Sequence, residues 1–466
     1  MEMTDLGPWG LEREGRELSW GGVSLVRLGR EFGTPLFVVN AARLRGSVAD
    51  FREAFRSGSL DPQPEVYYSF KTNPVPAVLR ALAGLGVGAE VISGFELWLA
   101  REAGLDGPRT IVNASLKDPE LLRRAVECGA RMVNVKNLAE LEALREAAAR
   151  AGKAANVGLR LNPGLRGRLF DLTTATGSIK SPLGFSRGGA DWAGAIRMLK
   201  GSPELRFRGL QFHIGSGIRS ARPYREALRN TVPALEEVLG HGLRPEVLDI
   251  GGGFGAPTVK EIGLLEALRL FAWNRPPRPP KPSANGFLRA VARACRDEVG
   301  AFAARNGVPA PRILVEPGRS LTASSQLLLL GVDAVVRRRN GRPAVFCDGG
   351  AMSLSQLLIS EYHAIVAANR NGAGPSETYD LFGGLPTPLD IVSFRRKLPR
   401  LESGDILAVM DTGAYFTSLG NNFAGGRPGI VMIDDGRAGL VRRRETYEDL
   451  VSRDGPPGGS PKETRA

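Results

Sequence analysis

The sequence predicts an α/β protein with two parts, a (β/α)₈ barrel followed by a mainly β domain. From Pro64 to about Gly318, short β-branched runs alternate with stretches that carry apolar residues at helical intervals. Such alternation is typical of a parallel sheet or barrel. After Arg319 the strand-like runs continue without regular helices between them. A chain of 466 residues is also long enough for two domains.

Eight strand-like runs precede Arg319, the number that closes a (β/α)₈ barrel. They are Val66–Phe70, Ala89–Ser93, Thr110–Ala114, Met132–Val135, Val157–Asn162, Gly209–Ile214, Val247–Ile250 and Ile313–Glu316. Helical spacing is clearest in Val78–Gly84, Leu121–Gly129, Leu138–Ala151 and Glu226–Leu239. Several of these stretches end at glycine, which is common at helix C-termini.

The rest of the chain predicts the second part and its boundaries. We expect residues 1–40 to contribute to the β domain, 41–320 to form the barrel, 321–451 to form the C-terminal β domain, and 452–466 to be a disordered tail. The predicted strands of the β domain are Leu327–Val336, Pro343–Cys347, Asp405–Met410 and Gly429–Ile433, with Leu36–Val39 joining from before the barrel. The proline-rich stretch Asn274–Pro282 predicts an irregular surface insertion.

Composition narrows the classes of function. The formal charge of +13 raises the possibility of nucleic-acid binding, but the arginines are scattered along helical stretches instead of forming a tract with interleaved aromatics. Cys128, Cys295 and Cys347 lie far apart, so they predict neither a disulfide framework nor a zinc or other metal site and are consistent with a reducing cytoplasm. No apolar run suggests a signal peptide or a membrane span.

Polar and glycine residues follow the predicted barrel strands, where the active sites of such barrels gather. They are Lys71, Ser93, Asn113, Asn162, His213, Gly251–Gly253 and Glu316–Arg319. A loop of no special function accounts for any one of them. A lysine, a histidine, three glycines and a glutamate at one end of a barrel together predict an active site.

Lys71 directly follows an apolar strand in Tyr67–Pro74. Burial inside a barrel disfavours the ammonium form, lowers the pKa of the amine and makes it a Schiff-base nucleophile. The alternative is a lysine at the rim whose ammonium group reaches water. Taken alone, Lys71 favours that alternative.

The glycines Gly251, Gly252 and Gly253 follow the strand Val247–Ile250. Glycine permits close approach and positive φ, so successive N–H groups can surround a phosphate. A tight turn is the simpler alternative, and Gly251, Gly253 and Ala256 also fit a loose dinucleotide pattern. Pro257 does not open a helix, and no acidic residue follows where a ribose would lie, so the nicotinamide hypothesis is disfavoured.

Glu316 and His213 complete the candidate set. Glu316 ends an apolar strand, and Pro317 and Gly318 fix the turn after it, so its carboxylate could pair with the ring nitrogen of a cofactor. The alternative is a structural pair with a barrel lysine or arginine. His213 taken alone is more simply a hydrogen-bonded core histidine.

Taken in order, these motifs resemble the fold-type III, pyridoxal-phosphate-dependent decarboxylases that act on diaminopimelate, ornithine, lysine or arginine. The resemblance runs from about Gly33 to Pro428. Its motifs are Tyr68–Asn73, Glu90–Glu96, Arg160–Pro163, His213–Ser216, Gly251–Gly253, Glu316–Arg319, Asp348–Gly349 and Asp411–Tyr415. The resemblance implies an alanine-racemase-like barrel, a β domain built from both chain ends, and a head-to-tail homodimer with active sites at the interface.

The resemblance also implies a role for each matching residue. Lys71 would carry pyridoxal 5′-phosphate as a Schiff base, His213 would stack on the ring, and Glu316 would keep the ring nitrogen protonated. The phosphate would be bound by Gly251, Gly252, Gly253, Gly318, Arg319 and Tyr415, with Ser216 beside it. Asn73 and Arg160 would line the cofactor pocket, and Glu90 stands where the family commonly has Asp.

The match fails in the segment Gly383–Asp390. There the family places a Cys, which protonates the substrate carbanion from the partner subunit, followed by an acidic residue for the distal amine. Pro386 and Thr387 occupy these positions, and proline can do neither job. Diaminopimelate enzymes also have an Arg for the distal carboxylate after the Asp348 motif, and Ser353–Ser360 contains none.

These departures predict a decarboxylase of an unusual amino acid or amino-acid derivative. Without the family's positioned acid, reprotonation would come from water, Lys71 or another group. Racemisation, β-elimination or condensation on the same fold is the first alternative, and a pyridoxal-phosphate-binding protein without catalysis is the second. Cys347 follows the apolar run Ala344–Phe346, which predicts a buried packing thiol and not a substitute acid.

Overall fold

The barrel is closed and parallel. The computed structural model describes residues 6–165, 177–178, 181–263, 265–266, 268–269, 286–370 and 376–454. Within them, eight strands follow the order β10-β11-β13-β5-β6-β7-β8-β9 around the barrel. The strands are β5 (Glu65–Ser69), β6 (Gly88–Val91), β7 (Thr110–Val112), β8 (Met132–Val135), β9 (Ala155–Arg160), β10 (Leu205–Gln211), β11 (Val247–Asp249) and β13 (Arg312–Val315). This arrangement confirms the predicted (β/α)₈ barrel.

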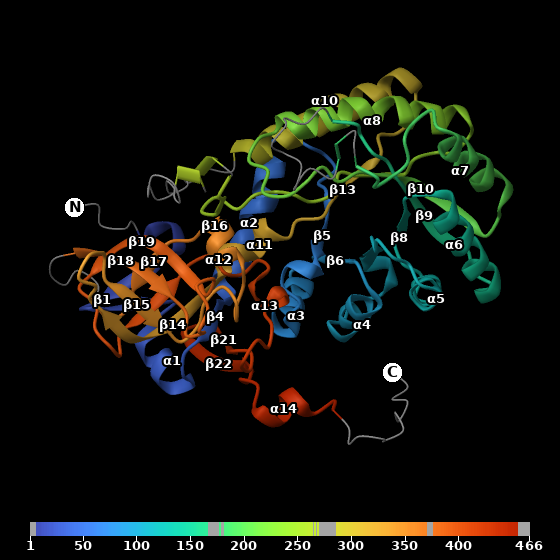
Figure 1. Ribbon diagram of the computed structural model, residues 1–466. Helices are drawn as coiled ribbons and strands as arrows, with labels where there is room; N and C mark the ends of the chain where they lie inside the picture. Colours follow the sequence, from blue (N-terminus) through green and yellow to red (C-terminus); the bar gives the residue numbers. More distant parts are fainter. Residues whose placement is uncertain are drawn as a thin grey trace.

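Helices cover the outside of the barrel (Figure 1). They are α2 (Ala41–Ser57), α3 (Pro76–Gly84), α4 (Gly94–Glu102), α5 (Pro119–Glu127), α6 (Leu138–Ala151), α7 (Ala190–Gly201), α8 (Arg222–Gly240) and α10 (Gly286–Asn306). Several begin at a residue whose side chain accepts from a backbone N–H of the first turn: Asn40, Ser93, Asp118 and Asn137. Such caps satisfy N–H groups that have no partner within the helix, so the sequence itself marks these starts.

The second part is a nine-stranded sheet with β4 (Leu36–Asn40) near its middle. β4 pairs with β14 and β21, which come from far along the chain. The other strands are β14 (Gln326–Val336), β15 (Ala344–Cys347), β17 (Ile365–Ala367), β18 (Ser376–Phe382), β19 (Ile391–Pro399), β20 (Ile406–Val409), β21 (Gly429–Asp434) and β22 (Arg437–Arg442). All five strands predicted for this domain are present, including the one from before the barrel.

The β domain contains more structure than the sequence pattern indicated. Before β4 the chain forms β1 (Leu11–Glu14), β2 (Glu17–Trp20), β3 (Val23–Ser24) and helix α1 (Leu25–Phe32), and β18, β19 and β22 were not predicted. β19 is only partly buried along much of its length, and β22 is largely exposed. Neither therefore has the apolar run by which buried strands are recognised. The predicted insertion Asn274–Pro282 lies outside the described residues.

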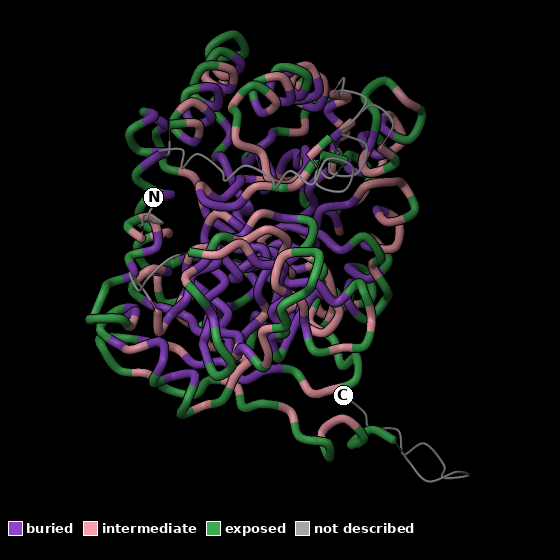
Figure 2. The backbone as a smooth tube through the Cα atoms, turned by 60° about the vertical axis from the view of Figure 1, so that its left-hand side comes forward, coloured by how far each residue is buried: buried purple, intermediate pink, exposed green. Residues whose placement is uncertain are grey.

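A strand pair, β12 (Lys260–Glu261) with β16 (Glu361–Tyr362), joins the two parts. The remaining short helices are α11 (Arg319–Thr322), α12 (Leu357–Ser360), α13 (Phe416–Leu419) and α14 (Tyr447–Val451). Buried residues run through both parts (Figure 2), and one core cluster contains barrel residues such as Leu248 together with β-domain residues such as Leu328. Among the described residues, none of the helices is long and apolar enough to cross a membrane.

Candidate active site

Lys71 lies at the C-terminal end of the barrel, in the 3₁₀ turn Phe70–Thr72 that follows β5. It lines a pocket with an empty volume of about 380 Å³. The other lining residues are Ser69, His213, Gly215, Ser216, Gly253, Phe254, Glu316, Gly318, Arg319 and Tyr415. The fold therefore brings together residues from several strand ends and from the β domain.

Two side chains hold the ammonium group of Lys71. Its Nζ donates to Ser69 Oγ at 2.6 Å and to Glu90 Oε2 at 2.9 Å. Because 37% of the Lys71 side chain is exposed, a molecule in the pocket can reach it. Burial favours the neutral amine, but the charges of Glu90 and Glu316 outweigh burial and raise the pKa of Lys71. The predicted lowering of this pKa is wrong, because the sequence did not reveal the Glu90 carboxylate at Nζ.

The glycine loop reaches the pocket at Gly253, while Gly251 and Gly252 are not among the lining residues. Gly251 and Gly253 have φ angles of 68° and 89°, which other residues rarely adopt. A Cβ at Gly252 would collide with the carbonyl of Glu316, and one at Gly253 would collide with that of Gly215. These positions therefore require glycine, and at Gly253 backbone instead of a side chain lines the pocket.

Arg319 is buried beside the pocket and paired with a residue that sequence analysis missed. Its two Nη atoms donate to Glu361 at 2.7 Å each, and its guanidinium lies 5.2 Å from the ring centroid of Tyr415. Among the described residues, Arg319 Nε has no hydrogen-bond partner. The Nε–H of Arg319 is therefore available as a donor, while Glu361 balances the charge of the guanidinium. Glu361 lies in no apolar run or glycine motif, so no sequence signal marked it.

His213 follows β10, two residues beyond its end. Its Nδ1 accepts from the backbone N–H of Gly252 at 3.3 Å, which leaves the ring proton on Nε2. Burial, together with the positive charges of Arg160 and Lys71, lowers the pKa of His213 to about 3. The imidazole is therefore neutral at ordinary pH, and a neutral ring can lie against an aromatic cofactor without adding charge.

Glu316 follows β13 directly and is 4% exposed. Its Oε1 accepts from Asn113 Nδ2 at 2.5 Å. Burial, reinforced by the negative charges of Asp249 and Glu90, raises the pKa of Glu316 well above its usual value. The place of Asn113 after a predicted strand marks it as a candidate. Asp249 lies within the predicted strand Val247–Ile250, so no sequence signal distinguishes it.

Some of the predicted site residues do not line the pocket. Asn73 is buried, donates to Gln326 Oε1 at 3.0 Å and accepts from Thr417 Oγ1 at 3.0 Å, so it ties the turn after β5 to the β domain. Arg160 and Glu90 lie behind the lining residues, where their charges act on Glu316. Cys347 is buried as predicted, and burial raises the pKa of its thiol.

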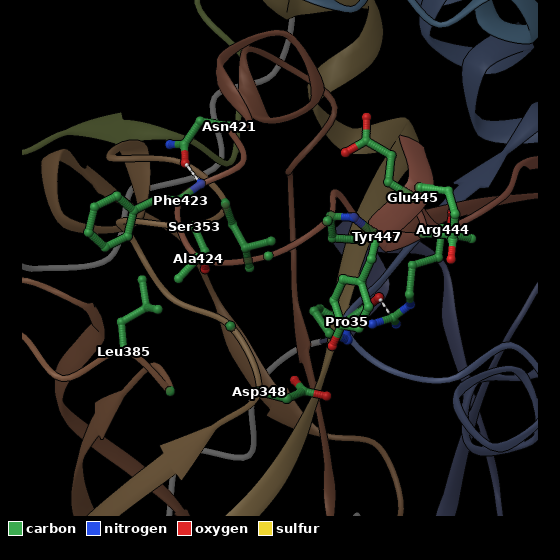
Figure 3. A pocket seen from close by; sticks show the side chains of 18 residues that line it. Pro35, Asp348, Ser353, Leu385, Asn421, Phe423, Ala424, Arg444, Glu445 and Tyr447 are labelled. Atoms are coloured by element: carbon green, nitrogen blue, oxygen red, sulfur yellow. Dashed lines mark hydrogen bonds between the residues drawn. The ribbon is translucent and has the colours of Figure 1, made fainter. Parts of the chain in front are cut away.

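A larger cavity, with an empty volume of about 1240 Å³, lies in the β domain (Figure 3). Asp348, Leu385, Phe423 and Tyr447 are among its lining residues. None of the predicted catalytic or cofactor-binding residues lines it. Gly384 and Leu385 line it, so it adjoins the segment Gly383–Asp390.

The residues of the first pocket fit pyridoxal phosphate. Lys71 is accessible to the aldehyde of the cofactor. The neutral imidazole of His213 and the buried carboxyl group of Glu316 can contact its ring. The backbone at Gly253 and the Nε–H of Arg319 can bind its phosphate. Among the described residues, no group of three or more His, Cys, Asp and Glu side chains could hold a metal ion. The fold and the site together define a pyridoxal-phosphate enzyme of the (β/α)₈-barrel class.

Comparison with known proteins identifies the family. Residues 42–323 match the family model described as pyridoxal-dependent decarboxylase, pyridoxal binding domain. The chain therefore belongs to the pyridoxal-dependent decarboxylase family. It is a pyridoxal-phosphate-dependent amino-acid decarboxylase.

Similar proteins cover nearly the whole chain. The diaminopimelate decarboxylase of Actinosynnema pretiosum subsp. auranticum is 33% identical over 97% of this chain and 95% of its own length. The diaminopimelate decarboxylase of Bacillus subtilis is 30% identical over 94% of this chain and 95% of its own length. The crystal structure of diaminopimelate decarboxylase from Methanocaldococcus jannaschii, solved also in co-complex with L-lysine, has a TM-score of 0.85 at 28% identity and covers 97% of this chain and 99% of its own.

Proposed function

We propose that this enzyme decarboxylates an amino acid whose distal end differs from that of diaminopimelate. The observation that carries the proposal is that Ser353–Ser360 contains no arginine to bind the distal carboxylate of diaminopimelate. Arg319 lines the pocket, but both of its Nη atoms bind Glu361 and its proposed partner is the phosphate. Arg319 therefore does not replace the missing arginine.

The roles proposed for the pocket residues follow from their contacts. When bound, pyridoxal phosphate supplies an electron sink for the electrons left behind by departing CO₂. Lys71 would hold it through Nζ, His213 would lie against the ring and Glu316 would face the ring nitrogen. Backbone groups of Gly251–Gly253 and Gly318, with Ser216, Arg319 and Tyr415, would hold the phosphate.

The proton donor is the second proposed departure from the relatives. Pro386 is exposed and has no proton to give. A positioned general acid typically contributes about 10²–10⁴-fold to a rate, so we expect slow turnover. Water or the Lys71 ammonium would then supply the proton to the substrate α-carbon.

Release of CO₂ by the pyridoxal-phosphate-loaded protein tests the proposed reaction. The samples would be diaminopimelate, lysine, ornithine and arginine singly, and a broad pool of other amino acids, with Lys71→Ala as the control. We expect release from the pool that requires Lys71, and little from diaminopimelate. Efficient release from diaminopimelate would overturn the proposed substrate change. Exchange of the α-hydrogen with deuterated solvent, without CO₂, would instead indicate racemase or eliminase chemistry on those substrates.

We also propose that the enzyme is a head-to-tail homodimer. Pro386 does not line the pocket of its own Lys71, so it could reach such a pocket only in a second copy. Exposed apolar side chains are present on both parts of the molecule: Phe95 and Trp98 on α4, and Leu389 and Phe423 in β-domain loops. Such groups are usual at protein interfaces.

Complementation between two inactive variants tests this dimer. We expect Lys71→Ala and Pro386→Trp each to abolish activity, the second by blocking the partner's pocket. In a head-to-tail dimer that contains one copy of each variant, one active site carries both substitutions and the other carries neither. Unfolding the two variants and refolding them together in equal amounts makes about half of the dimers mixed, so about a quarter of all active sites are restored. No recovery, with both variants folded and mixed dimers present, would exclude a shared site.

A further inference from the structure

Arg319 and Glu361 form a buried ion pair at the side of the pocket. Their side chains are 8% and 3% exposed. Nη1 of Arg319 lies 2.7 Å from Oε2 of Glu361, and Nη2 lies 2.7 Å from Oε1. Two parallel contacts of this kind fix the plane of a guanidinium as well as its position. The pair also connects α11, which follows the last barrel strand, with β16 from the other part of the molecule.

A buried histidine restricts the Glu361 carboxylate. Nε2 of His363 lies 3.4 Å from Oε2 of Glu361. The other ring nitrogen, Nδ1, lies 3.0 Å from the carbonyl oxygen of Met410, to which it can only donate. The ring of His363 is 2% exposed and meets the ring of Phe416 edge-on, with the two centroids 5.1 Å apart. Because His363 is held on these sides, the carboxylate has little room to move away from Arg319.

The ion pair exchanges electrostatic attraction for a fixed orientation of Arg319. The Glu361 carboxylate cancels much of the attraction that the guanidinium would exert on a phosphate. Its two contacts use two of the five N–H groups of the guanidinium, and Nε has no partner among the described residues. Tyr415, whose ring centroid is 5.2 Å from Cζ of Arg319, lines the pocket together with Arg319. An unpaired arginine side chain populates many rotamers, so holding it in one conformation beforehand lowers the entropy that phosphate binding loses.

We propose that Glu361 is a positioning residue: it orients Arg319 so that the N–H groups not bound to Glu361 face the phosphate of the cofactor. This inference rests on the proposed role of Arg319 in binding the phosphate. A carboxylate that only neutralised Arg319 would weaken phosphate binding, because its charge has the same sign as that of the phosphate. A carboxylate that positions Arg319 strengthens phosphate binding. The two roles therefore predict effects of opposite sign.

Binding of pyridoxal and of pyridoxal phosphate to the apoenzyme separates the two roles without measuring activity. The readout is the dissociation constant of pyridoxal, which lacks the phosphate, divided by that of pyridoxal phosphate. We expect Glu361→Gln to lower this ratio about tenfold, the usual effect of losing a hydrogen bond to a charged group. Glu377→Gln is the matched control, because Glu377 binds both Nη atoms of Arg337 and neither residue lines the pocket. Its ratio should equal that of the wild type.

A ratio that rises or stays unchanged in Glu361→Gln would overturn the inference. Arg319→Gln tests the role on which the inference rests: if this variant keeps the wild-type ratio, Arg319 does not bind the phosphate and its proposed role fails instead. A fall in Arg319→Gln without a fall in Glu361→Gln would overturn the inference and leave the role of Arg319 intact.

A second variant decides the matter should Glu361→Gln not fold. Glu361→Asp retains the negative charge beside Arg319 but withdraws the carboxylate by one methylene group, so the two parallel contacts cannot both form in place. Positioning predicts that the ratio falls in Glu361→Asp as well. Neutralisation alone predicts the wild-type ratio, and that result would contradict the inference.

Discussion

At the scale of the residue, the chemistry of Lys71 depends on its contact with Glu90. An amine at the end of a barrel strand is a nucleophile only after it has lost its proton. The Glu90 carboxylate, 2.9 Å from Nζ and 1% exposed, favours the protonated form. Lys71 is therefore held in an ion pair with Glu90, and binding of the cofactor aldehyde has to compete with that pair.

Glu90→Gln should make Lys71 a better nucleophile in the apoenzyme. In the wild type the pKa of Lys71 is raised because the charge of Glu90 outweighs burial, so the rate of Schiff-base formation rises only toward high pH. Removing the charge lowers that pKa, and we expect the rate profile to move at least about one unit toward lower pH. Stopped-flow absorbance with pyridoxal phosphate from about pH 6 to about pH 10 measures it.

Glu65→Gln is the matched control, because Glu65 begins the same strand at the opposite end of the barrel. Its profile should coincide with that of the wild type. A Glu90→Gln profile that also stays in place would show that Glu90 does not control the protonation of Lys71.

At the scale of the element, backbone hydrogen bonds hold the glycine loop after β11 in place. Tyr224 in α8 donates from its hydroxyl to the carbonyl of Gly252 at 2.8 Å, and the N–H of Ile218 donates to the carbonyl of Gly253 at 2.8 Å. The loop is thus held on both sides, and it cannot shift to accommodate a side chain without breaking these bonds.

Gly252→Ala should therefore weaken cofactor binding. The added Cβ meets the Glu316 carbonyl, so the loop and the turn after β13 must move apart, and we expect pyridoxal phosphate to bind at least about tenfold more weakly. Fluorescence titration of the apoenzyme measures this. Gly300→Ala in α10 is the control, since its Cβ meets nothing within 4 Å and alanine favours a helix. Equal affinity in the two variants would show that the loop does not bind cofactor.

At the scale of the whole molecule, Asp411 joins three distant parts of the chain. Its carboxylate accepts from the indole Nε1 of Trp9 at 2.8 Å and from the hydroxyl of Thr258 at 2.7 Å. Trp9 precedes β1 and Thr258 belongs to the loop after the glycines. The β domain therefore carries both the N-terminal segment and a loop adjoining the active site.

Asp411→Ala should destabilise the protein by about 2–4 kcal/mol, because two buried donors lose their acceptor. Thermal and denaturant unfolding would show a lower midpoint. Asp411 also has a positive φ of 61°, and alanine would be strained there. Asp435→Ala is the control for this strain, because Asp435 has a positive φ of 45° and an exposed side chain. If both variants lose the same stability, backbone strain and not the junction explains the effect.

The sequence by itself determined the barrel, the strands of the β domain with long apolar runs, and the placement of Lys71, His213, Glu316 and the glycines at strand ends. These follow from local patterns, because burial dictates apolar periodicity and turns dictate glycine. Strands such as β19 and β22 could not be predicted, since they are stabilised by pairing with distant segments and not by their own composition.

Only the tertiary structure determines which charged side chains lie in contact within the active site. Glu90 at Lys71 and Glu361 at Arg319 are contacts between residues that lie 19 and 42 positions apart. A pKa depends on the distance to each charge and on burial, and neither can be read from the order of residues. The raised pKa of Lys71 and the charge balance at Arg319 therefore follow from folding alone.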